Sequence, residues 1–367
     1  MYTSLKKIID SSESMKNIYQ PVFFRLSVQI EKQIFFDLVK EKPFIKIFDQ
    51  IKSQVEELLK LLSPKTSFSK EKLSDAAKEY IGSLVPEEFG VWVYYPWSNT
   101  IVHLLDEKEF IIVRTNRNKN KITSEEQDIL GTKKVGVIGL SVGQSVSLAL
   151  ALERSFGELR IADFDVLDMS NLNRIRTGVH NLQLKKSVAC AREISEIDPY
   201  LKVTCFHDGI NDENIDSFFS EGGNLDALIE ECDNLNIKIT SRLKARKLGI
   251  PVIMDTSDRG MLDIERYDLE RERPIFHGLL EHYNLNESFI DPEKRMEIIY
   301  SILDKNKITP RFKESINEIG KTLTTWPQLA SSVISGGANA AEIYRKIMLK
   351  CPIQSGRYYV DLDELVG

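Results

Sequence analysis

Acidic, amide and basic side chains gather around a glycine-containing turn between residues 133 and 186. The chain reads K-K-V-G-V-I-G-L-S-V-G-Q-S from Lys133, and an apolar helical run separates this turn from the acidic sequence G-E-L-R-I-A-D-F-D-V-L-D. A strand, a turn with glycine, a helix and a second strand that ends in acids are typical of a nucleotide-binding βαβ unit. We therefore expect a nucleotide site at the ends of these two strands.

Three residues of the turn are the predicted phosphate contacts. Gly139 suits a tight turn, and Gly143 would let the start of a helix approach phosphate oxygens, which backbone N–H groups and the helix dipole attract. Ser141 stands where a G-x-G-x-x-G turn has its second glycine, and Gln144 is expected to crowd the phosphate approach. The turn could instead be a packing contact between helix and strand, and both interpretations stay open.

Two carboxylates, Asp163 and Asp165, end the second predicted strand after the glycine turn. A carboxylate at this place accepts hydrogen bonds from ribose hydroxyls in dinucleotide-binding folds. We favour this role for Asp163, with Asp165 beside it at the same nucleotide site. In the alternative, both are ordinary strand-end acids that cap the next turn.

An amide and a guanidinium follow these acids. In the sequence S-N-L-N-R, Asn171 and Arg174 lie just past the acidic strand end, and a loop that folds back would let Arg174 contact phosphate in bidentate fashion. Lys185 and Lys186 open the next predicted helix, where cations oppose the helix dipole unless an anion is bound. These residues indicate triphosphate chemistry rather than hydride transfer. The alternative for the lysines is that they extend into solvent.

A further carboxylate, Asp233, follows the predicted strand in L-I-E-E-C-D-N and reaches the same edge of the sheet. Mg²⁺ prefers carboxylate oxygens and keeps several waters, so Asp233 is a candidate magnesium ligand. The alternative is that Asp233 caps the helix that begins near Asn236.

The composition limits the class of protein. At 367 residues the chain has room for about two domains, and its apolar content is enough for a sizeable core. The net charge of −6 argues against nucleic acid as the main partner. Four cysteines lie far apart without a C-x-x-C pair, which gives neither a zinc ribbon nor a disulfide framework. Without a long apolar run or a secretory signal core, we expect a cytoplasmic protein with no membrane span.

The first part of the chain predicts two regions. Residues 1–85 look helical, because apolar residues recur at helical spacing, as they do from Ile51 onward. Residues 86–125 predict a β meander and a basic loop. The three expected strands of the meander are Val91–Pro96, Ile101–Leu105 and Phe110–Arg114. The basic run Arg114–Lys121 is a solvated loop on its simplest interpretation.

Strands alternate with helices over residues 126–280, which predicts an α/β fold class with a Rossmann-like, mostly parallel twisted sheet and helices on both faces. Five strands are expected at Val135–Leu140, Leu159–Asp165, Lys202–Phe206, Leu225–Cys232 and Val252–Asp255. Residues 259–280 predict further strands at the sheet edge. Residues 281–367 form a C-terminal helical region and tail, in which the small residues S-G-G-A-N-A-A would permit close backbone approach.

Together, these motifs resemble the ThiF, MoeB and ubiquitin-activating-enzyme superfamily of ATP-dependent adenylyltransferases. Its members share a strand, a glycine turn and a helix, then D-x-D…S-N-L-x-R-Q, a lysine at a helix start and D-x-x-D-N. The counterparts here are D-F-D-V-L-D-M-S-N-L-N-R-I, K-K-S-V-A-C-A-R-E-I and E-E-C-D-N. The interval from Lys186 to Asp198-Pro199 matches the family's and selects Lys186 over Lys185. The resemblance covers roughly residues 114–280.

The resemblance implies ATP and Mg²⁺ as cofactors, Arg174 and Lys186 as catalytic cations, and a homodimer. The family carries R-Y-x-R-Q ahead of its first strand, and R-T-N-R-N here suggests that Arg117 reaches the nucleotide of the partner subunit. The sequences D-T-S-D-R-G-M-L-D-I-E-R-Y-D and T-T-W-P-Q-L-A-S-S-V also resemble the ThiF-like half of bacterial ThiF–nitroreductase fusion proteins. The family's zinc-binding C-x-x-C pairs are missing, and no cysteine is clearly placed for a thioester step.

We therefore expect an ATP-dependent adenylyltransferase that activates a substrate carboxylate as an acyl-adenylate and releases pyrophosphate. The substrate is unknown, and a peptide or small-protein C-terminus is one candidate. Two alternatives stay open. One is a degenerate nucleotide-binding or scaffold module, and the other is an NAD(P)-binding oxidoreductase or a partner of a flavin nitroreductase domain.

Overall fold

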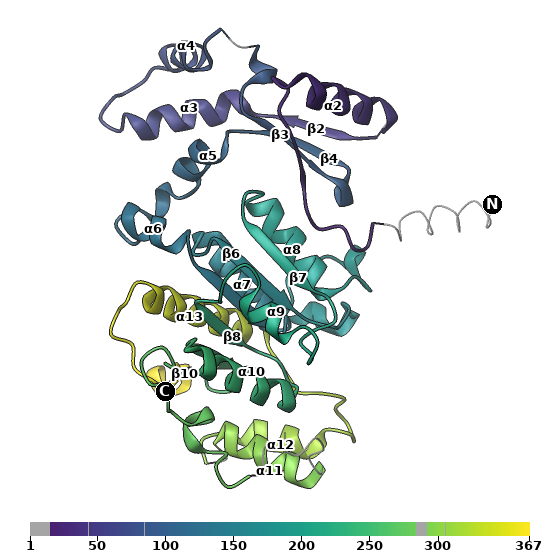
Figure 1. Ribbon diagram of the computed structural model, residues 1–367, viewed down its shortest axis with the longest axis vertical. Coiled ribbons are helices and arrows are strands. Elements are labelled where there is room, and N and C mark those ends of the chain that lie inside the picture. The colour runs from purple at the N-terminus through teal and green to yellow at the C-terminus, as the bar shows by residue number, and fades with distance from the viewer. Residues whose placement is uncertain (1–14, 43, 84, 284–291, 305) are drawn as a thin grey trace, which may run out of the picture. The chain divides into compact units, whose positions relative to one another are not determined.

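The computed structural model describes residues 15–42, 44–83, 85–283, 292–304 and 306–367 (Figure 1). Among these residues, the chain up to Ser124, together with Ser195–Tyr200, forms a first compact unit. Glu125–Ile194 and Leu201–Gly367 form a second. The predicted division of the chain into four regions stays a prediction.

The described part of the first unit contains a four-stranded sheet in the order β1-β3-β4-β2. β3 is antiparallel to both β1 and β4, whereas β2 runs parallel to β4. The strands are β1 (Val22–Phe24), β2 (Lys46–Asp49), β3 (Val91–Tyr95) and β4 (Thr100–Leu104). The helices are α2 (Gln29–Glu41), α3 (Ile51–Leu62), α4 (Lys70–Ile81), η1 (Pro86–Glu88), η2 (Pro96–Ser98), α5 (Glu107–Arg114) and η3 (Asn116–Asn118).

Two predictions for this unit are wrong. Residues Phe110–Arg114 belong to the helix α5 rather than to a third meander strand. Glu107 and Glu109 in the first turn of α5 complement the helix dipole, and Phe110 packs with Val113 against α3, as residues three apart on a helix do. The region 1–85 is also not purely helical, since β1 and β2 lie within it, and its first fourteen residues lie outside the described part of the chain.

The second unit is built on a seven-stranded sheet of described residues, in the order β11-β10-β9-β8-β5-β6-β7. β5 to β9 are parallel, and β10 is antiparallel to its neighbours β9 and β11. The strands are β5 (Lys134–Ile138), β6 (Glu158–Ala162), β7 (Lys202–Phe206), β8 (Ala227–Glu230), β9 (Val252–Thr256), β10 (Met261–Glu265) and β11 (Gly356–Tyr359). The predicted mixed α/β fold with a mostly parallel sheet is confirmed.

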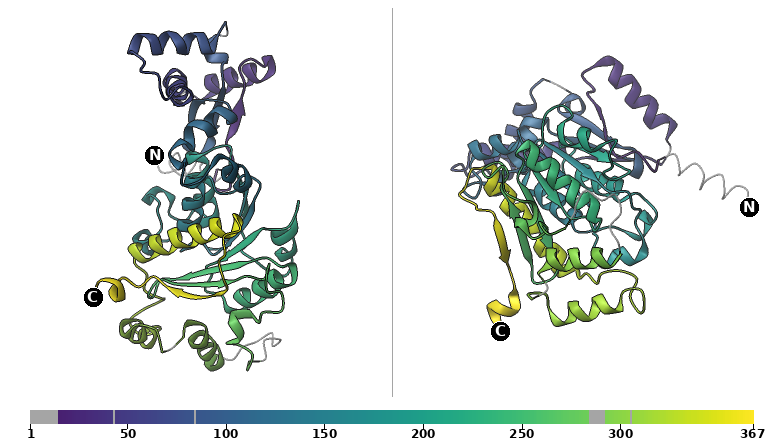
Figure 2. Two further views of the ribbon diagram at one scale, coloured as in Figure 1. Left: turned by 90° about the vertical axis from the view of Figure 1, so that its left-hand side faces the viewer. Right: turned by 60° about the horizontal axis from the view of Figure 1, so that its bottom comes forward.

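Helices cover both faces of this sheet, with α13 on one face and α11 and α12 on the other (Figure 2). Apolar side chains of α9, α10 and α11 share a core with residues of the strands they cover. The helices are α6 (Ser124–Leu130), α7 (Gly143–Glu153), η4 (Met169–Asn173), η5 (Val179–Asn181), α8 (Lys186–Ile197), α9 (Ile215–Ser220), α10 (Leu235–Leu248), η6 (Ile275–Gly278), α11 (Pro292–Leu303), α12 (Pro310–Glu318), α13 (Ala330–Met348) and α14 (Leu362–Val366). None of the described helices is long and apolar enough to span a membrane.

The small residues of α13 let its backbone approach α7 and β9 closely, as the sequence predicted. A Cβ atom added at Gly337 would lie 2.7 Å from Cβ of Ser145 on α7. One added at Gly336 would overlap the carboxylate of Asp255 at the end of β9. At the sheet edge the prediction was only partly right, because β10 is a strand but Ile275–Gly278 is a short helix.

Candidate functional site

The carboxyl ends of β5 and β8 meet at the topological switch point of the sheet. The chain passes from β5 to β6 and β7 on one side and then crosses to β8 on the other, which is where open α/β sheets bind ligands. Gly139, just after β5, has a φ of +85°, and a Cβ there would lie 2.7 Å from the backbone N of Cys232. Glycine is therefore required at this position both by its conformation and by the close backbone approach.

Gly143, the first residue of α7, has a different role from Gly139. A Cβ at Gly143 would lie 2.6 Å from Cγ1 of Val137, so this glycine lets α7 pack closely on β5. The packing interpretation therefore accounts for Gly143, and phosphate binding by the first turn of α7 stays a prediction. The expected crowding by Gln144 is wrong, because its side chain is buried and makes two hydrogen bonds of 3.0 Å with the backbone of Arg176.

Asp163 follows β6 directly and holds the glycine turn in place. Its buried carboxylate accepts hydrogen bonds from the backbone N–H of Leu140 (2.7 Å) and of Asp165 (2.8 Å). Burial raises the pKa of Asp163, while Lys186 and the two backbone donors act to lower it. These contacts make Asp163 a structural link between two strand ends, and its binding of ribose stays a prediction.

The two lysines at the start of α8, Lys185 just before it and Lys186 as its first residue, have different partners. Nζ of Lys186 lies 2.7 Å from Oδ2 of Asp165, and the Lys186 side chain is almost fully buried. Nζ of Lys185 instead donates to the carbonyl of His207 at 2.8 Å, near the end of β7. Lys186 is therefore the lysine that pairs with an acid at the end of β6, and its contact with a nucleotide stays a prediction.

Arg174 lies against the glycine turn. Its Nε donates to Oγ of Ser141 at 2.9 Å, and Nη1 donates to Oδ1 of Asn173 at 2.9 Å. Burial lowers the pKa of Arg174, while Asp233 acts to raise it. Oδ1 of Asn171 accepts the N–H of Asp168 in a reciprocal cap of η4, so Asn171 shapes the loop that carries Arg174. Contact of Asn171 with a bound nucleotide stays a prediction.

Asp233 is not the cap of α10. Asn234 takes that role, with its Oδ1 accepting the N–H groups of Asn236 (3.0 Å) and Ile237 (3.2 Å). Desolvation by the surrounding protein raises the pKa of Asp233, and Glu230 adds to the rise, while Lys238, Lys186 and Arg174 act to lower it. The residue itself is exposed at the surface. Among the described residues, no hydrogen bond to the Asp233 carboxylate is found. Asp233 is therefore available for a ligand and shares its electrostatic surroundings with Arg174 and Lys186.

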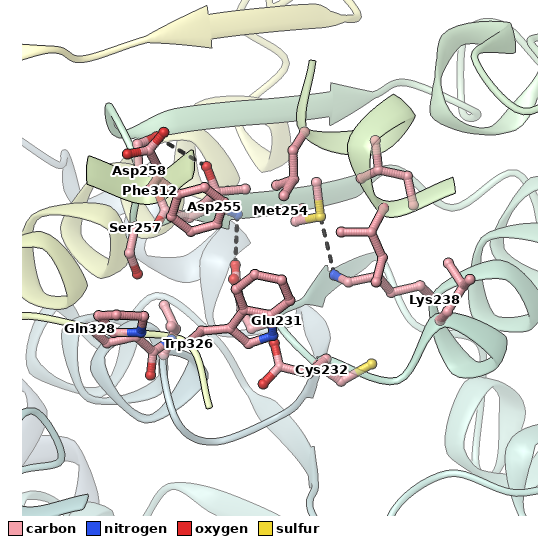
Figure 3. A pocket seen from close by; sticks show the side chains of 18 residues that line it. Glu231, Cys232, Lys238, Met254, Asp255, Ser257, Asp258, Phe312, Trp326 and Gln328 are labelled. Carbon is pink, nitrogen blue, oxygen red and sulfur yellow. Dashed lines mark hydrogen bonds between the residues drawn. The ribbon is translucent and has the colours of Figure 1, made fainter. Parts of the chain in front are cut away.

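A cavity of about 130 Å³ opens next to Asp233 and Val142 (Figure 3). It is enclosed by the ends of β8 and β9, by α10, α11 and α12, and by the segment that precedes α13. Gln328 of that segment accepts a hydrogen bond from Oγ of Ser141 with its side chain (3.2 Å) and one from Asn173 with its carbonyl (2.8 Å). The C-terminal segment thus reaches the glycine turn as well as the cavity.

The sequence interpretation missed most of the cavity. Glu231, Asp255 and Lys238 are among its lining residues, but the carboxylate oxygens of Asp255 are buried against Gly336 of α13 and do not face the cavity. Cys232 lines it too, but burial raises the pKa of its thiol well above the ordinary value and Glu230 adds to the rise, so it is a poor nucleophile. The sequence did contain one sign of Asp255. This acid lies at the end of the fifth predicted strand, just as Asp163 and Asp165 lie at the end of the second, and the ends of parallel strands are where site residues are expected.

Arg117 lies in the first unit, in the short helix η3, and the glycine turn lies in the second. Its predicted reach to the nucleotide of a partner subunit therefore stays a prediction.

The order of the five parallel strands and the glycine turn at the switch point define a Rossmann-like domain. Residues 115–267 match the model of the ThiF family. The predicted resemblance is thereby confirmed, whereas fusion to a nitroreductase stays a prediction.

Two curated proteins illustrate the similarity. The chain is 43% identical over 278 residues to the uncharacterized protein MT1398 of Mycobacterium tuberculosis. The matched region covers 76% of this chain and 38% of that protein. It is also 29% identical over 160 residues to the tRNA threonylcarbamoyladenosine dehydratase of Bacillus subtilis. This matched region covers 42% of this chain and 60% of that enzyme. The chain therefore spans less than two thirds of either relative.

Solved structures with a similar fold include two Escherichia coli proteins crystallised with ATP. The tRNA N6-threonylcarbamoyladenosine dehydratase TcdA superposes with a TM-score of 0.46 and 16% identity over 67% of this chain and 97% of that one. MccB superposes with a TM-score of 0.43 and 15% identity over 64% of this chain and 65% of that one. These scores are too low to support an argument about function.

Proposed function

We propose that the ThiF-family domain is an ATP-dependent adenylyltransferase. An oxygen of a substrate carboxylate bonds to the α-phosphorus of ATP, the bond from that phosphorus to the bridging oxygen of the β-phosphate breaks, and pyrophosphate leaves. The products are an acyl-adenylate and pyrophosphate. The proposal rests on the family match of residues 115–267 and on the charges around the switch point.

One observation carries the proposal above the others. The guanidinium of Arg174 lies 2.9 Å from Ser141 on the glycine turn, while Arg174 and Lys186 both act on the charge of Asp233. Negative charge grows on the α-phosphate oxygens as the carboxylate attacks, and preorganised cations stabilise it. Arg174 and Lys186 would supply these cations, and Asp163 would hold the ribose beside the turn it already fixes.

The residues also suit a magnesium ion held largely by the nucleotide. Mg²⁺ is usually bound by one or two carboxylates and by phosphate oxygens, and it keeps several waters. Asp233 offers one carboxylate without a hydrogen bond among the described residues, and the described residues contain no cluster of three or more ligands that could hold a metal alone. When bound, the ion would neutralise charge on the leaving pyrophosphate.

Several parts of the proposal concern partners. We infer a homodimer in which Arg117 of one subunit contacts the nucleotide of the other. The carboxylate would belong to a small molecule, a peptide or a protein C-terminus. A nitroreductase domain elsewhere in the natural protein would be a second functional partner.

Exchange of radioactive pyrophosphate into ATP tests the reaction, with a panel of candidate carboxylates. Arg174→Ala should lower the exchange rate by about 10³-fold or more, as loss of a phosphate-stabilising arginine does in other enzymes. Arg176→Ala is the matched control, because Arg176 lies two residues away, is exposed and pairs with Glu193. Equal loss in both variants, or no loss in Arg174→Ala, would contradict the role of Arg174.

A binding module without catalysis is the second candidate, and the contact of Gln328 with Ser141 favours it. Phosphate oxygens would have to replace this hydrogen bond on the glycine turn. Calorimetric titration with ATP and Mg²⁺ separates the candidates. Binding without exchange would favour the module, and binding of NADH without binding of ATP would favour an NAD(P) enzyme.

A further inference from the structure

We propose that the cavity beside Asp233 binds an apolar group of the acyl substrate, of about the size of one aromatic ring. The substrate class is then a carboxylic acid whose acyl part carries this group. That the group belongs to the acyl substrate rests on the proposed adenylyltransferase function. Binding of the group itself does not, because it depends only on the walls of the cavity.

Apolar side chains form much of the cavity wall. Ile299, Ile302 and Leu303 line it, and their spacing of three and four residues puts them on one face of α11. Phe312 and Trp326 line it as well, and their rings stack with centroids 5.6 Å apart and planes 9° from parallel. Transfer of an apolar group from water to such walls is favourable, because apolar surface is removed from contact with water.

Two charged side chains of the wall are matched within the protein. The carboxylate of Asp258 accepts the N–H of Thr309 at 3.0 Å with one oxygen and its hydroxyl at 2.7 Å with the other. Nζ of Lys238 donates to both oxygens of Glu230 at 3.1 Å. These groups therefore need no charged ligand in the cavity.

The two buried acids at the ends of β8 and β9 also agree with an apolar ligand. The carboxylate oxygens of Asp255 are buried against Gly336 of α13 and do not face the cavity. Oε1 of Glu231 accepts the backbone N–H of Asp255 at 2.9 Å. Burial and the nearby Asp255 hold the pKa of Glu231 well above its ordinary value, which favours its neutral form. Neither acid therefore places a charge against an apolar ligand.

The volume of the cavity limits the group that fits. Apolar cavities of roughly 150 Å³ in other proteins hold a benzene molecule. A volume of about 130 Å³ therefore suits a group of about six carbon atoms. Contact with the rings of Phe312 and Trp326 favours an aromatic group over an alkyl group of the same volume.

The position of the cavity connects it to the predicted phosphate site. Val142, which lines the cavity, directly follows Ser141 of the glycine turn. Gln328 lines the cavity too, and its side chain accepts the hydroxyl of Ser141 at 3.2 Å. Asp233 belongs to both places, because it lines the cavity and interacts electrostatically with Arg174. A substrate can therefore place its carboxylate at the α-phosphate and its apolar group in the cavity.

Calorimetric titration of the full chain with toluene, without ATP, tests the cavity directly. Toluene should bind at least about tenfold more tightly than benzylammonium, which has the same ring but must lose the hydration of its charge. Leu303→Trp fills the cavity and should weaken toluene binding about tenfold or more. The control is Leu243→Trp, the same change at an exposed residue of α10 outside the cavity wall, which should leave the affinity unchanged. Equal affinity for toluene and benzylammonium, or unchanged toluene affinity in Leu303→Trp, would overturn the proposal.

A second variant decides if near-ultraviolet circular dichroism shows that Leu303→Trp is not folded. Ile299→Trp, one turn earlier on α11, places the same ring in the cavity and should weaken toluene binding to a similar extent. Unchanged affinity in this variant would contradict the proposal equally. The comparison of toluene with benzylammonium needs only the wild-type chain, so it can refute the proposal by itself.

Pyrophosphate exchange connects the cavity to the reaction. Exchange should be at least about tenfold faster with 3-phenylpropionate or with acetyl-glycyl-phenylalanine than with acetate, because the ring is bound in the cavity. The first acid is a small molecule and the second a peptide end, so the faster of the two identifies the source of the apolar group. Toluene binding without exchange by any acid would refute the adenylyltransferase proposal alone. Equal exchange with all three acids, without toluene binding, would refute the cavity proposal alone.

Discussion

Glu230 and Glu231 are neighbours at the end of β8, and both are buried, but their surroundings differ. Although burial acts to raise it, the pKa of Glu230 lies below its ordinary value, because Lys238 and Arg242 stabilise the charged form. The pKa of Glu231 lies well above its ordinary value, because burial and the nearby Asp255 both disfavour the charged form. One glutamate is thus fully compensated and the next is not.

The comparison separates a charge that the protein compensates from one that it does not. Arg242 bonds both Glu230 and Glu265 and lies 4.0 Å from the ring centroid of Phe276, so this network joins α10 to β8, β10 and η6. The charges of this network are balanced within the protein, so it needs no ligand for its stability. The Glu231–Asp255 pair, by contrast, destabilises the fold when it is charged, because neither carboxylate has a cation beside it comparable to Arg242.

The largest expected effect comes from breaking the compensated network. Arg242→Met leaves Glu230 and Glu265 without their shared cation in the core, which should lower the free energy of unfolding by about 3–5 kcal/mol. Urea denaturation measures it, with Lys247→Met, an exposed residue of the same helix, as the control. A loss no larger than in the control would show that the network is not structural.

The next effect concerns the backbone that covers Asp255. Gly336→Ala places a methyl group on the Asp255 carboxylate and should cost about 1–3 kcal/mol by overpacking. Combining it with Asp255→Ala should cost less than the sum of the two single changes, because the clash is removed. Strict additivity in a urea double-mutant cycle would argue that the two residues are not in contact.

The third prediction concerns the uncompensated carboxylate Asp255, and its effect on stability is no larger than that of Gly336→Ala. Because the pKa of Asp255 is raised in the folded state, the folded chain binds this proton more strongly, and wild-type stability should fall as pH rises above the ordinary value of 3.8. Asp255→Asn removes the charge and should raise stability at pH 7 by about 1–3 kcal/mol. Thermal melts from pH 4 to pH 8 test this. A variant that melts below wild type at pH 7 would contradict an uncompensated charge.

The sequence predicted the parallel core because strands and helices alternate there with clear apolar patterns. It also placed Asp163, Arg174, Lys186 and Asp233 at one sheet edge, since the residues after parallel strands converge. The prediction of a strand at Phe110–Arg114 was wrong because a short apolar run is compatible with either a strand or a helix. The contact with α3, which the sequence does not show, selects the helix.

The cavity could not be predicted for a different reason. Glu231 and Asp255 belong to separate strands, and Phe312 and Trp326 come from a distant part of the chain. Which of two adjacent glutamates is compensated depends on the face that each presents to α10, and composition does not reveal it. Gly143 likewise matched a phosphate-binding pattern but packs on Val137.

The contact between Gly139 and Cys232 means that main chain alone sets the spacing between the glycine turn and the segment that carries Asp233. Side chains on either segment can therefore change without altering that spacing. The same arrangement makes a single added methyl group at Gly139 sufficient to push the two segments apart.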